Sequence, residues 1–172
     1  MNDLKRLFFG LRLNDEARHA VAQAASAVRF DKGRLHPPEN LHLTLAFIGE
    51  YPDPEDVLDT IASVPFSPFP LRLDGFGNFG DLWWVGLSQS GALDAAVRRL
   101  RRALSDAGIP FDRKRFSPHI TMIRKATFSG RRFPSVRIPP AGMTVDRISL
   151  MRSDRGKNGM IYTELGSIHA DI

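Results

Sequence analysis

The chain repeats one pattern in its two halves. Residues 9–11 (Phe-Gly-Leu) stand just before a predicted helix, and so do residues 85–87 (Val-Gly-Leu). Residues 42–44 have the sequence His-Leu-Thr, and residues 119–121 have the sequence His-Ile-Thr. Two copies of one unit usually pack about a pseudo-twofold axis, which places equivalent residues opposite each other. The repeat therefore predicts that the two His-x-Thr triplets face one another in the fold.

Hydrophobic periodicity and turn residues divide each half into strands and helices. The first half predicts strands over 6–13, 42–50 and 69–77, helices over 15–28 and 53–61, and a turn at 37–40. The second half predicts strands over 81–87, 119–125, 144–153 and 161–168, and one helix over 90–107. Residues 125–140 show no helical period, so the second half is expected to lack the second helix of the first.

Helical spacing also predicts which helix positions are buried. In the first helix these positions are Ala17, Ala20, Val21, Ala24 and Val28. In the helix of the second half they are Leu93, Ala96, Val97, Leu100, Ala103, Leu104 and Ala107. The arginines of that helix lie opposite the apolar stripe, which predicts a solvated face, with attraction of RNA as the alternative; they are Arg98, Arg99, Arg101 and Arg102.

The two triplets lie in strand-like runs, where successive side chains point to opposite faces. His42 and Thr44 share one face of the first run, and His119 and Thr121 share one face of the second. The opposite faces are predicted to be core, with Leu41, Leu43, Leu45 and Phe47 in the first run and Ile120 and Met122 in the second. A histidine beside a hydroxyl either satisfies its hydrogen bonds in a buried wall or lines a binding site. A duplicated pair in matching strands favours the second interpretation.

Cleavage of a phosphodiester by in-line displacement is a reaction that two facing histidines can catalyse. The reaction needs a base that takes a proton from the attacking oxygen and an acid that protonates the leaving oxygen. Imidazole has an unperturbed pKa near 6.5, so one neutral and one protonated histidine can coexist near neutral pH. The two threonine hydroxyls can donate hydrogen bonds to the non-bridging phosphate oxygens. Such a mechanism requires no metal and no cofactor.

Composition limits the class of protein. A chain of 172 residues with 42% hydrophobic residues suits one domain, predicted over 1–172. There is no cysteine, no apolar run long enough to span a bilayer and no signal-peptide pattern at the N-terminus, which predicts a cytoplasmic protein without membrane association. The net charge of +5, carried mostly by arginine, favours an anionic partner, although a surface kept soluble by arginine explains it equally well.

Four segments together resemble one known family. RLFFGL, PPENLHLTLAFIGE, LWWVGL and FSPHITMIRK look like the landmarks, in their usual order, of the two-histidine (2H) phosphoesterases, in particular the RNA 2′,3′-cyclic phosphodiesterases, also called 2′-5′ RNA ligase-like proteins. The resemblance implies a bilobal α+β fold of duplicated β-α-β-α-β units, with pseudo-twofold symmetry around a central cleft. It implies hydrolysis of RNA 2′,3′-cyclic phosphate ends to 2′-phosphomonoesters, and in some members reversible 2′-5′ ligation. The expected partner is RNA with such ends, and the protein is expected to be a monomer without an obligate protein partner.

The resemblance also suggests roles for individual residues. His119 is expected to act as general base on water and His42 as general acid on the departing 3′ oxygen, although the pseudo-symmetry leaves the two roles interchangeable. Thr44 and Thr121 are expected to bind substrate. Arg124 stands where the family often has a basic residue after the second motif, and it is a further candidate for phosphate binding. Strand alternation places Arg124 on the Ile120 face unless the strand bulges.

Several alternatives remain open at the level of sequence. One alternative is that the paired histidines are structural residues with satisfied hydrogen bonds and no catalytic role. Another is that they bind zinc, although the strands that hold them offer no cysteine or acid beside them. An RNA-end binding module without turnover, or a 2H enzyme for another small cyclic phosphate, would carry the same motifs. The remaining histidines are predicted to be structural or exposed; they are His19, His36 and His169. Trp83 and Trp84 point to opposite faces of one strand, so one is expected in the core and the other is a candidate to stack on a base.

Overall fold

The computed structural model describes residues 4–128 and 135–171. Within these residues the chain forms three α-helices, nine β-strands and a short 3-10 helix. In chain order the elements are β1 (Lys5–Arg12), α1 (Asp15–Ala27), β2 (Lys32–Leu35), the 3-10 helix (Pro38–Asn40), β3 (His42–Tyr51), α2 (Pro54–Ile61), β4 (Phe69–Phe79), β5 (Leu82–Leu87), α3 (Gly91–Asp106), β6 (Ile120–Thr127), β7 (Gly142–Val145), β8 (Arg147–Gly156) and β9 (Gly159–His169).

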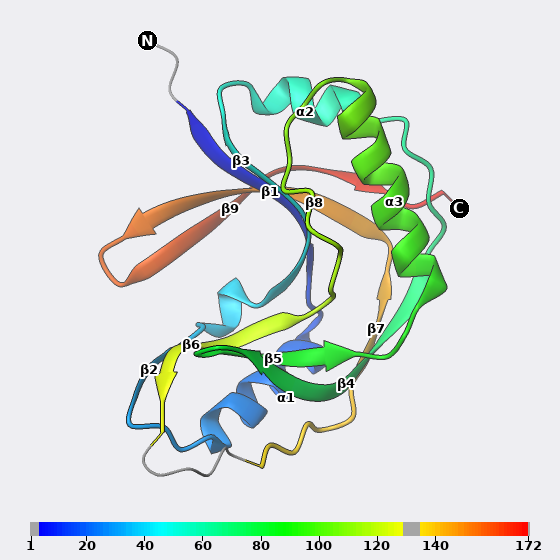
Figure 1. Cartoon of the computed structure of the whole chain (residues 1–172). Helices are drawn as coiled ribbons and strands as arrows, with labels where there is room; N and C mark the ends of the chain where they lie inside the picture. Colours follow the sequence, from blue (N-terminus) through cyan, green and yellow to red (C-terminus); the bar gives the residue numbers. More distant parts are fainter. Residues whose placement is uncertain (1–3, 129–134, 172) are drawn as a thin grey trace.

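The strands form two antiparallel sheets, which lie one above the other in Figure 1. The four-stranded sheet has the order β3-β1-β8-β9, and the five-stranded sheet has the order β2-β6-β5-β4-β7. The repeat is visible in these orders, because β3, β1, β8 and β9 occupy the same relative places as β6, β5, β4 and β7. β2 is an additional strand at the edge beside β6. The predicted α+β fold with pseudo-twofold symmetry is therefore confirmed.

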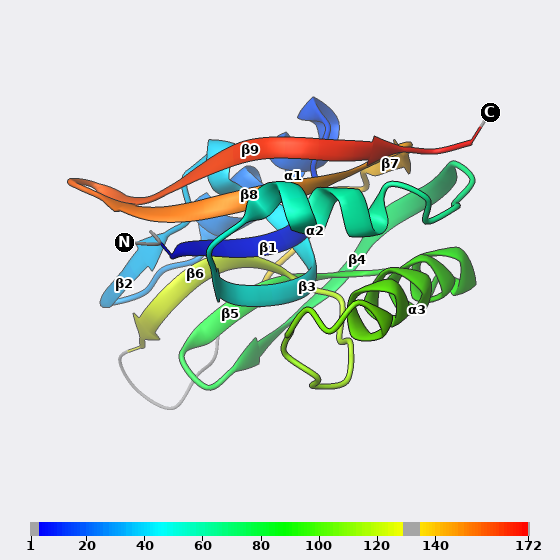
Figure 2. The same ribbon diagram turned by 90° about the horizontal axis from the view of Figure 1, so that it is seen from above.

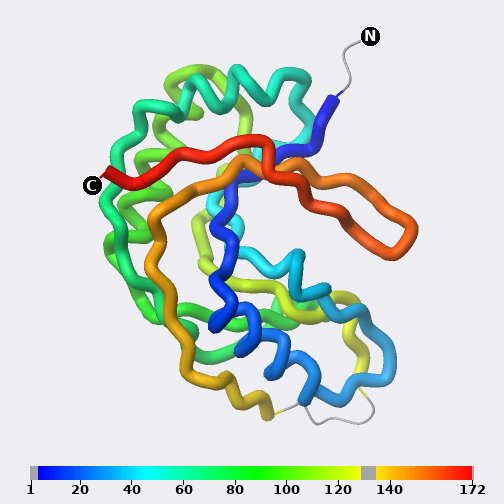
Figure 3. Tube along the Cα trace, turned by 180° about the vertical axis from the view of Figure 1, so that it is seen from behind, coloured from blue at the N-terminus to red at the C-terminus, as the bar shows by residue number. Residues whose placement is uncertain are grey.

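The two halves exchange elements. The third strand of the first half, β4, lies in the five-stranded sheet, and β8 from the second half lies in the four-stranded sheet. α1 contacts β6 and β7, whereas α3 contacts β3. α2 contacts α3 and β9, and Figure 2 shows these two helices side by side, while Figure 3 shows α1 apart from them. Each half is thus packed onto strands of the other.

The helices begin where their capping residues predict. The Asn14 side chain accepts a hydrogen bond from the backbone N of Ala17 over 2.8 Å, and the Ser90 hydroxyl accepts one from Leu93 over 3.1 Å. All four predicted positions inside α1 are buried, and Val28 is buried as the residue that caps its C-terminus. In α3 the predicted stripe is correct except for Ala103, which is half-buried, and Ala107, which is exposed because the helix ends at Asp106.

The observed strands differ from the predicted ones in two places. Residues 144–153 form not one strand but the end of β7 and the start of β8, and the break at Asp146 sends the chain from one sheet to the other. The sequence also gave no sign of β2, because all four of its residues are exposed and lack an apolar pattern. The prediction of a missing second helix falls partly on residues 129–134, outside the described part of the chain; residues 135–141 contain none.

Candidate active site

His42 opens β3 and is held at both ring nitrogens. Its Nδ1 lies 2.7 Å from the backbone O of Asn40, and its Nε2 lies 2.9 Å from Oγ1 of Thr44. Because a carbonyl oxygen only accepts hydrogen bonds, Nδ1 carries the proton, and Nε2 of the neutral ring accepts from the Thr44 hydroxyl. Asn40 is itself fixed, since its Nδ2 donates to the backbone O of Met160 over 2.8 Å. The local backbone thus selects one tautomer of His42.

His119 directly precedes β6 and repeats the contact that His42 makes through Nδ1. Its Nδ1 lies 2.7 Å from the backbone O of Ser117, two residues earlier, just as Asn40 precedes His42 by two. Thr121 follows on β6, is half-buried and pairs in register with Trp84 of β5. Both histidines therefore donate from Nδ1 to a backbone oxygen, and in the neutral rings Nε2 is the nitrogen without a proton.

The structure brings the two triplets close enough for His119 to act electrostatically on His42. β3 and β6 are in contact with each other although they belong to different sheets. Burial lowers the pKa of His42, and the positive charges of Arg124 and His119 lower this pKa further, against the hydrogen bond to Asn40, which raises it. The charge of His119 therefore acts on His42 across the space between the two strands.

Aromatic rings surround both histidines. The ring centroid of Phe8 lies 4.8 Å from that of His42, and Tyr162 meets the same imidazole edge to face at 5.1 Å. Phe79 meets the His119 ring edge to face at 5.0 Å, and Trp84 lies 6.4 Å from it. Trp83 is buried in the core, so Trp84 is the tryptophan that lies near the site. These rings restrict the histidine side chains to one orientation each.

Both strands contain a β-bulge directly after the triplet. The pairing of β3 with β1 shifts at this point, and Leu45 and Ala46 are both buried. The pairing of β6 with β5 shifts likewise, and Met122 and Ile123 are both buried. A bulge reverses the alternation of side chains, so the fifth residue after each histidine returns to the face of the triplet. That residue is Arg124 in β6.

The equivalent residue in β3 is Phe47, and its predicted place in the core was wrong. Phe47 is only half-buried, because the bulge turns it away from the face that carries Leu43 and Leu45. The guanidinium carbon of Arg6 lies 5.1 Å from the centroid of its ring. The two halves thus differ at equivalent positions, with a positive charge in one and an aromatic ring in the other.

Arg124 is joined to a histidine that the sequence did not single out. Its Nε donates to Nε2 of His36 over 2.9 Å, across the pairing of β2 with β6. Burial, the Arg124 charge and the His42 charge, in that order, lower the pKa of His36 to about 4. His36 is therefore neutral near pH 7 and accepts from the arginine. It was predicted to be structural or exposed, and a half-buried place beside Arg124 could not be inferred without β2.

Arg101 of α3 binds the backbone at the bulge of β3. Its Nε and Nη2 donate to the backbone O of Leu45 over 3.3 and 3.2 Å, and its Nη1 donates to the backbone O of Lys114 over 2.7 Å. It also lies 5.8 Å from the ring centroids of Phe111 and Phe116. The prediction of a solvated face was correct for Arg98, Arg99 and Arg102 and wrong for Arg101. This arginine ties the strand of His42 to the loop that leads to His119.

Residues 4–128 and 135–171 lack two features that would indicate a bound metal or a membrane-spanning segment. No cluster of three or more His, Cys, Asp or Glu side chains suited to a metal ion occurs there. No helix in the same residues has the length and apolar character needed to cross a membrane. Of the other predicted histidines, His19 and His169 are both exposed.

Comparison with known proteins identifies relatives along nearly the whole chain. The profile of the 2′-5′ RNA ligase superfamily matches residues 13–157. An RNA 2′,3′-cyclic phosphodiesterase of Thermus thermophilus is 34% identical over 93% of this chain and 87% of its own. The enzyme of the same name from Escherichia coli is 32% identical over 96% of each chain.

Solved structures lead to the same group. E. coli LigT complexed with 3′-AMP superposes with a TM-score of 0.83 at 28% identity, and the match covers 99% of this chain and all of that one. A Thermus thermophilus protein, TT0787, superposes with a TM-score of 0.78 at 30% identity over 95% of this chain and 97% of its own. With its two His-x-Thr strands and these matches along nearly its full length, the chain belongs to the 2′-5′ RNA ligase superfamily of 2H phosphoesterases.

Proposed function

We propose that this protein hydrolyses the 2′,3′-cyclic phosphate at the end of an RNA to a 2′-phosphomonoester. The observation that carries the proposal is the matched pair of histidines, each with Nδ1 fixed by a backbone carbonyl two residues upstream, with the charge of His119 lowering the pKa of His42. The relatives in Thermus thermophilus and E. coli are named for this activity, which supports the choice of substrate.

In the reaction, a water attacks phosphorus opposite the bond to the 3′ oxygen. His119 Nε2 takes a proton from the water as the P–O bond forms, and His42 gives its Nε2 proton to the 3′ oxygen as the P–O3′ bond breaks. The burial that lowers the pKa of His42 in the free protein opposes an acid role. The negative charge of a bound phosphate raises the pKa of a neighbouring imidazole and restores the proton.

Thr44 links the protonation of His42 to phosphate binding. In the neutral ring Nε2 accepts from the Thr44 hydroxyl at 2.9 Å. Once Nε2 is protonated it becomes a donor, so the hydroxyl hydrogen turns to a new acceptor, and a non-bridging phosphate oxygen supplies one. In this proposal Thr121 makes the equivalent contact from β6. Arg124, with its Nε bound to His36, keeps its terminal nitrogens for the phosphate.

The same displacement forms a 2′-5′ linkage when an RNA 5′-hydroxyl replaces water as the attacking group. The proton still leaves the nucleophile for one histidine, and the 3′ oxygen still departs with a proton from the other. Hydrolysis and ligation then differ only in which nucleophile occupies the position of the water.

Phosphorus NMR tests the proposal directly. An RNA oligonucleotide ending in 2′,3′-cyclic phosphate is incubated with the wild-type protein, with His119→Ala and with His19→Ala, in the presence of EDTA. We expect the cyclic signal to convert to a 2′-monoester with wild type and with His19→Ala, whose imidazole is exposed on α1, but not with His119→Ala. A cyclic signal that stays unchanged with wild type would rule out this substrate.

A further inference from the structure

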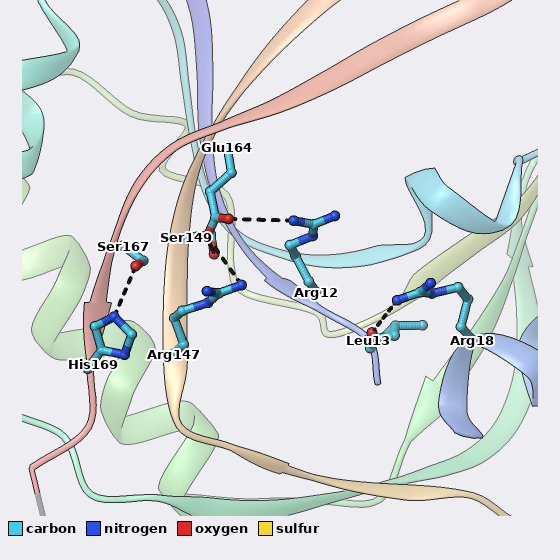
Figure 4. Close-up of polar contacts among 8 residues, drawn as sticks. All are labelled: Arg12, Leu13, Arg18, Arg147, Ser149, Glu164, Ser167 and His169. Atoms are coloured by element: carbon cyan, nitrogen blue, oxygen red, sulfur yellow. Dashed lines mark hydrogen bonds and ion pairs between the residues drawn. The ribbon is translucent and has the colours of Figure 1, made fainter. Parts of the chain in front are cut away.

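A polar groove of about 420 Å³ lies where β1, α1, β7, β8 and β9 meet, and one residue of its lining, Arg12, pairs in register with His42. Figure 4 shows its three arginines, Arg12, Arg18 and Arg147, which come from segments distant in sequence. The polar residues that line it are Arg12, Asn14, Arg18, Thr144, Asp146, Arg147, Ser149 and His169. No step of the proposed hydrolysis uses them.

Glu164 holds two of these arginines in place. Its Oε2 lies 3.5 Å from Nη1 of Arg12, and its Oε1 lies 3.5 Å from Nη2 of Arg147. The buried hydroxyl of Ser149 donates to the same carboxylate over 2.6 Å. The arginine side chains remain 48% and 41% exposed, whereas that of Glu164 is 24% exposed. Each guanidinium has five N–H donors, so a pair anchored through one nitrogen each keeps donors for an anion.

The groove continues the sheet face that carries His42. Arg12 pairs in register with His42, and Phe8, four residues before Arg12 on β1, contacts the His42 ring. A Cβ added at Gly10 would lie 3.6 Å from the His42 imidazole, so alternate residues of β1 share that face. Ser149 pairs with Gly10 on the next strand. One face of the four-stranded sheet thus carries His42, Arg12 and Arg147, with the buried Phe8, Gly10 and Ser149 between them.

We propose that this groove binds the phosphodiester backbone of the RNA strand that leads to the cyclic phosphate end. The inference rests on the proposed function, because it assigns the chain of the same substrate to a surface continuous with His42. Paired arginines present planar donors that match phosphate oxygens. The Glu164 carboxylate between the arginines reduces the net charge of the groove, so an isolated phosphate ion binds weakly. An RNA strand whose cyclic end is already bound at the histidines binds better, because its contact with the groove is then intramolecular.

The test compares two substrates, a nucleoside 2′,3′-cyclic phosphate and a short RNA ending in the same group. The double variant Arg12→Gln/Arg147→Gln is expected to reduce the ratio of kcat/KM for the RNA to kcat/KM for the nucleotide about tenfold. The dependence of log(kcat/KM) for the RNA on log salt should become shallower by about 1.4, the value for two lost single-strand phosphate contacts.

A matched double variant controls for net charge. Arg99→Gln/Arg102→Gln removes the same charge from exposed positions of α3, and we expect it to leave the ratio unchanged. An unchanged ratio in the Arg12/Arg147 variant, or an equal decrease in the α3 variant, would overturn the groove assignment and leave the proposed function intact. If wild type consumes neither substrate, the proposed function fails, and fluorescence anisotropy of the labelled RNA against the two double variants still decides whether the groove binds it.

Discussion

Arg124 donates its Nε hydrogen to Nε2 of His36 over 2.9 Å, and His36 is in turn anchored by its backbone N to the backbone O of Met122 over 2.9 Å. An arginine bound through Nε can no longer rotate freely about its last bonds, so its two terminal nitrogens keep one direction. His36 directly follows the edge strand β2 and holds Arg124 through this hydrogen bond. It is therefore a candidate positioning residue.

Two replacements of His36 test whether its role depends on the hydrogen-bond acceptor at Nε2 or on the volume of its ring. His36→Phe keeps an aromatic ring but removes the acceptor, and we expect KM for the cyclic substrate to increase by roughly tenfold as Arg124 loses its anchor. His36→Gln supplies an amide oxygen in place of Nε2 and should recover most of the loss. Steady-state kinetics of the two variants measures the difference, and equal KM values for Phe and Gln would exclude a positioning role.

Removing either of the two imidazoles proposed as acid and base should abolish most turnover without unfolding the chain. A general acid or base contributes on the order of 10²- to 10⁴-fold to the rate, so His42→Ala and His119→Ala should each reduce kcat by about that factor. Both rings are held by local backbone carbonyls rather than by the deep core, so circular dichroism should remain that of wild type. Near wild-type rates in both variants would contradict the two-histidine mechanism.

The lowered pKa of His36 predicts a loss of stability in mild acid. In the unfolded chain His36 takes up a proton as the pH falls through 6.5, whereas in the folded protein it stays neutral until about pH 4. Protonation therefore favours the unfolded state, and the free energy of unfolding should decrease between pH 6.5 and 4, by at most roughly 3 kcal/mol from this group. The lowered pKa of His42 acts in the same direction.

Urea titrations across this pH window measure the effect. The decrease should be smaller in His36→Gln, which has no titrating group at this position, than in wild type. A decrease of equal size in both proteins would assign the acid sensitivity to other residues.

Arg101 offers a test of the support behind the bulge. Arg101→Lys keeps the charge, but a single ammonium cannot reach the backbone oxygens of Leu45 and Lys114 together as the guanidinium does. We expect the free energy of unfolding to decrease by about 2 kcal/mol, with a parallel loss of kcat as His42 shifts. Arg98→Lys, an exposed arginine on the same helix, is the matched control and should change neither quantity.

Much of the fold follows from local signals in the sequence. The capped starts of α1 and α3 and the alternating runs of β1, β3, β5 and β6 were all predicted to within a few residues, because each depends on its own residues and their nearest neighbours. β2 was missed and the break at Asp146 was missed for one reason. Both depend on pairing with distant strands, and neither leaves a pattern in the residues themselves.

The residues of the candidate site likewise fall into those that local spacing predicts and those that depend on distant contacts. His42, Thr44, His119 and Thr121 could be found from spacing, because two residues apart in a strand means one face. Arg124 and Phe47 could not be placed, since a bulge in each strand reverses the face and no residue type near Leu45 or Met122 announces it. His36 and Arg101 act through tertiary hydrogen bonds to backbone or side chains more than fifty residues away, and sequence spacing carries no information about such contacts.

The exchange of elements between the halves sets the order in which the chain can fold. α1 contacts strands that are synthesised about a hundred residues later, and β1 pairs with β8 from the other end of the chain. A fragment comprising the first half would leave α1 and one side of β1 without partners, so we expect it to be unstructured in isolation. Long sequence separation between contacts slows folding, and closure of the four-stranded sheet must await the last third of the sequence. The two halves of the repeat are therefore expected to fold only together, as one cooperative unit.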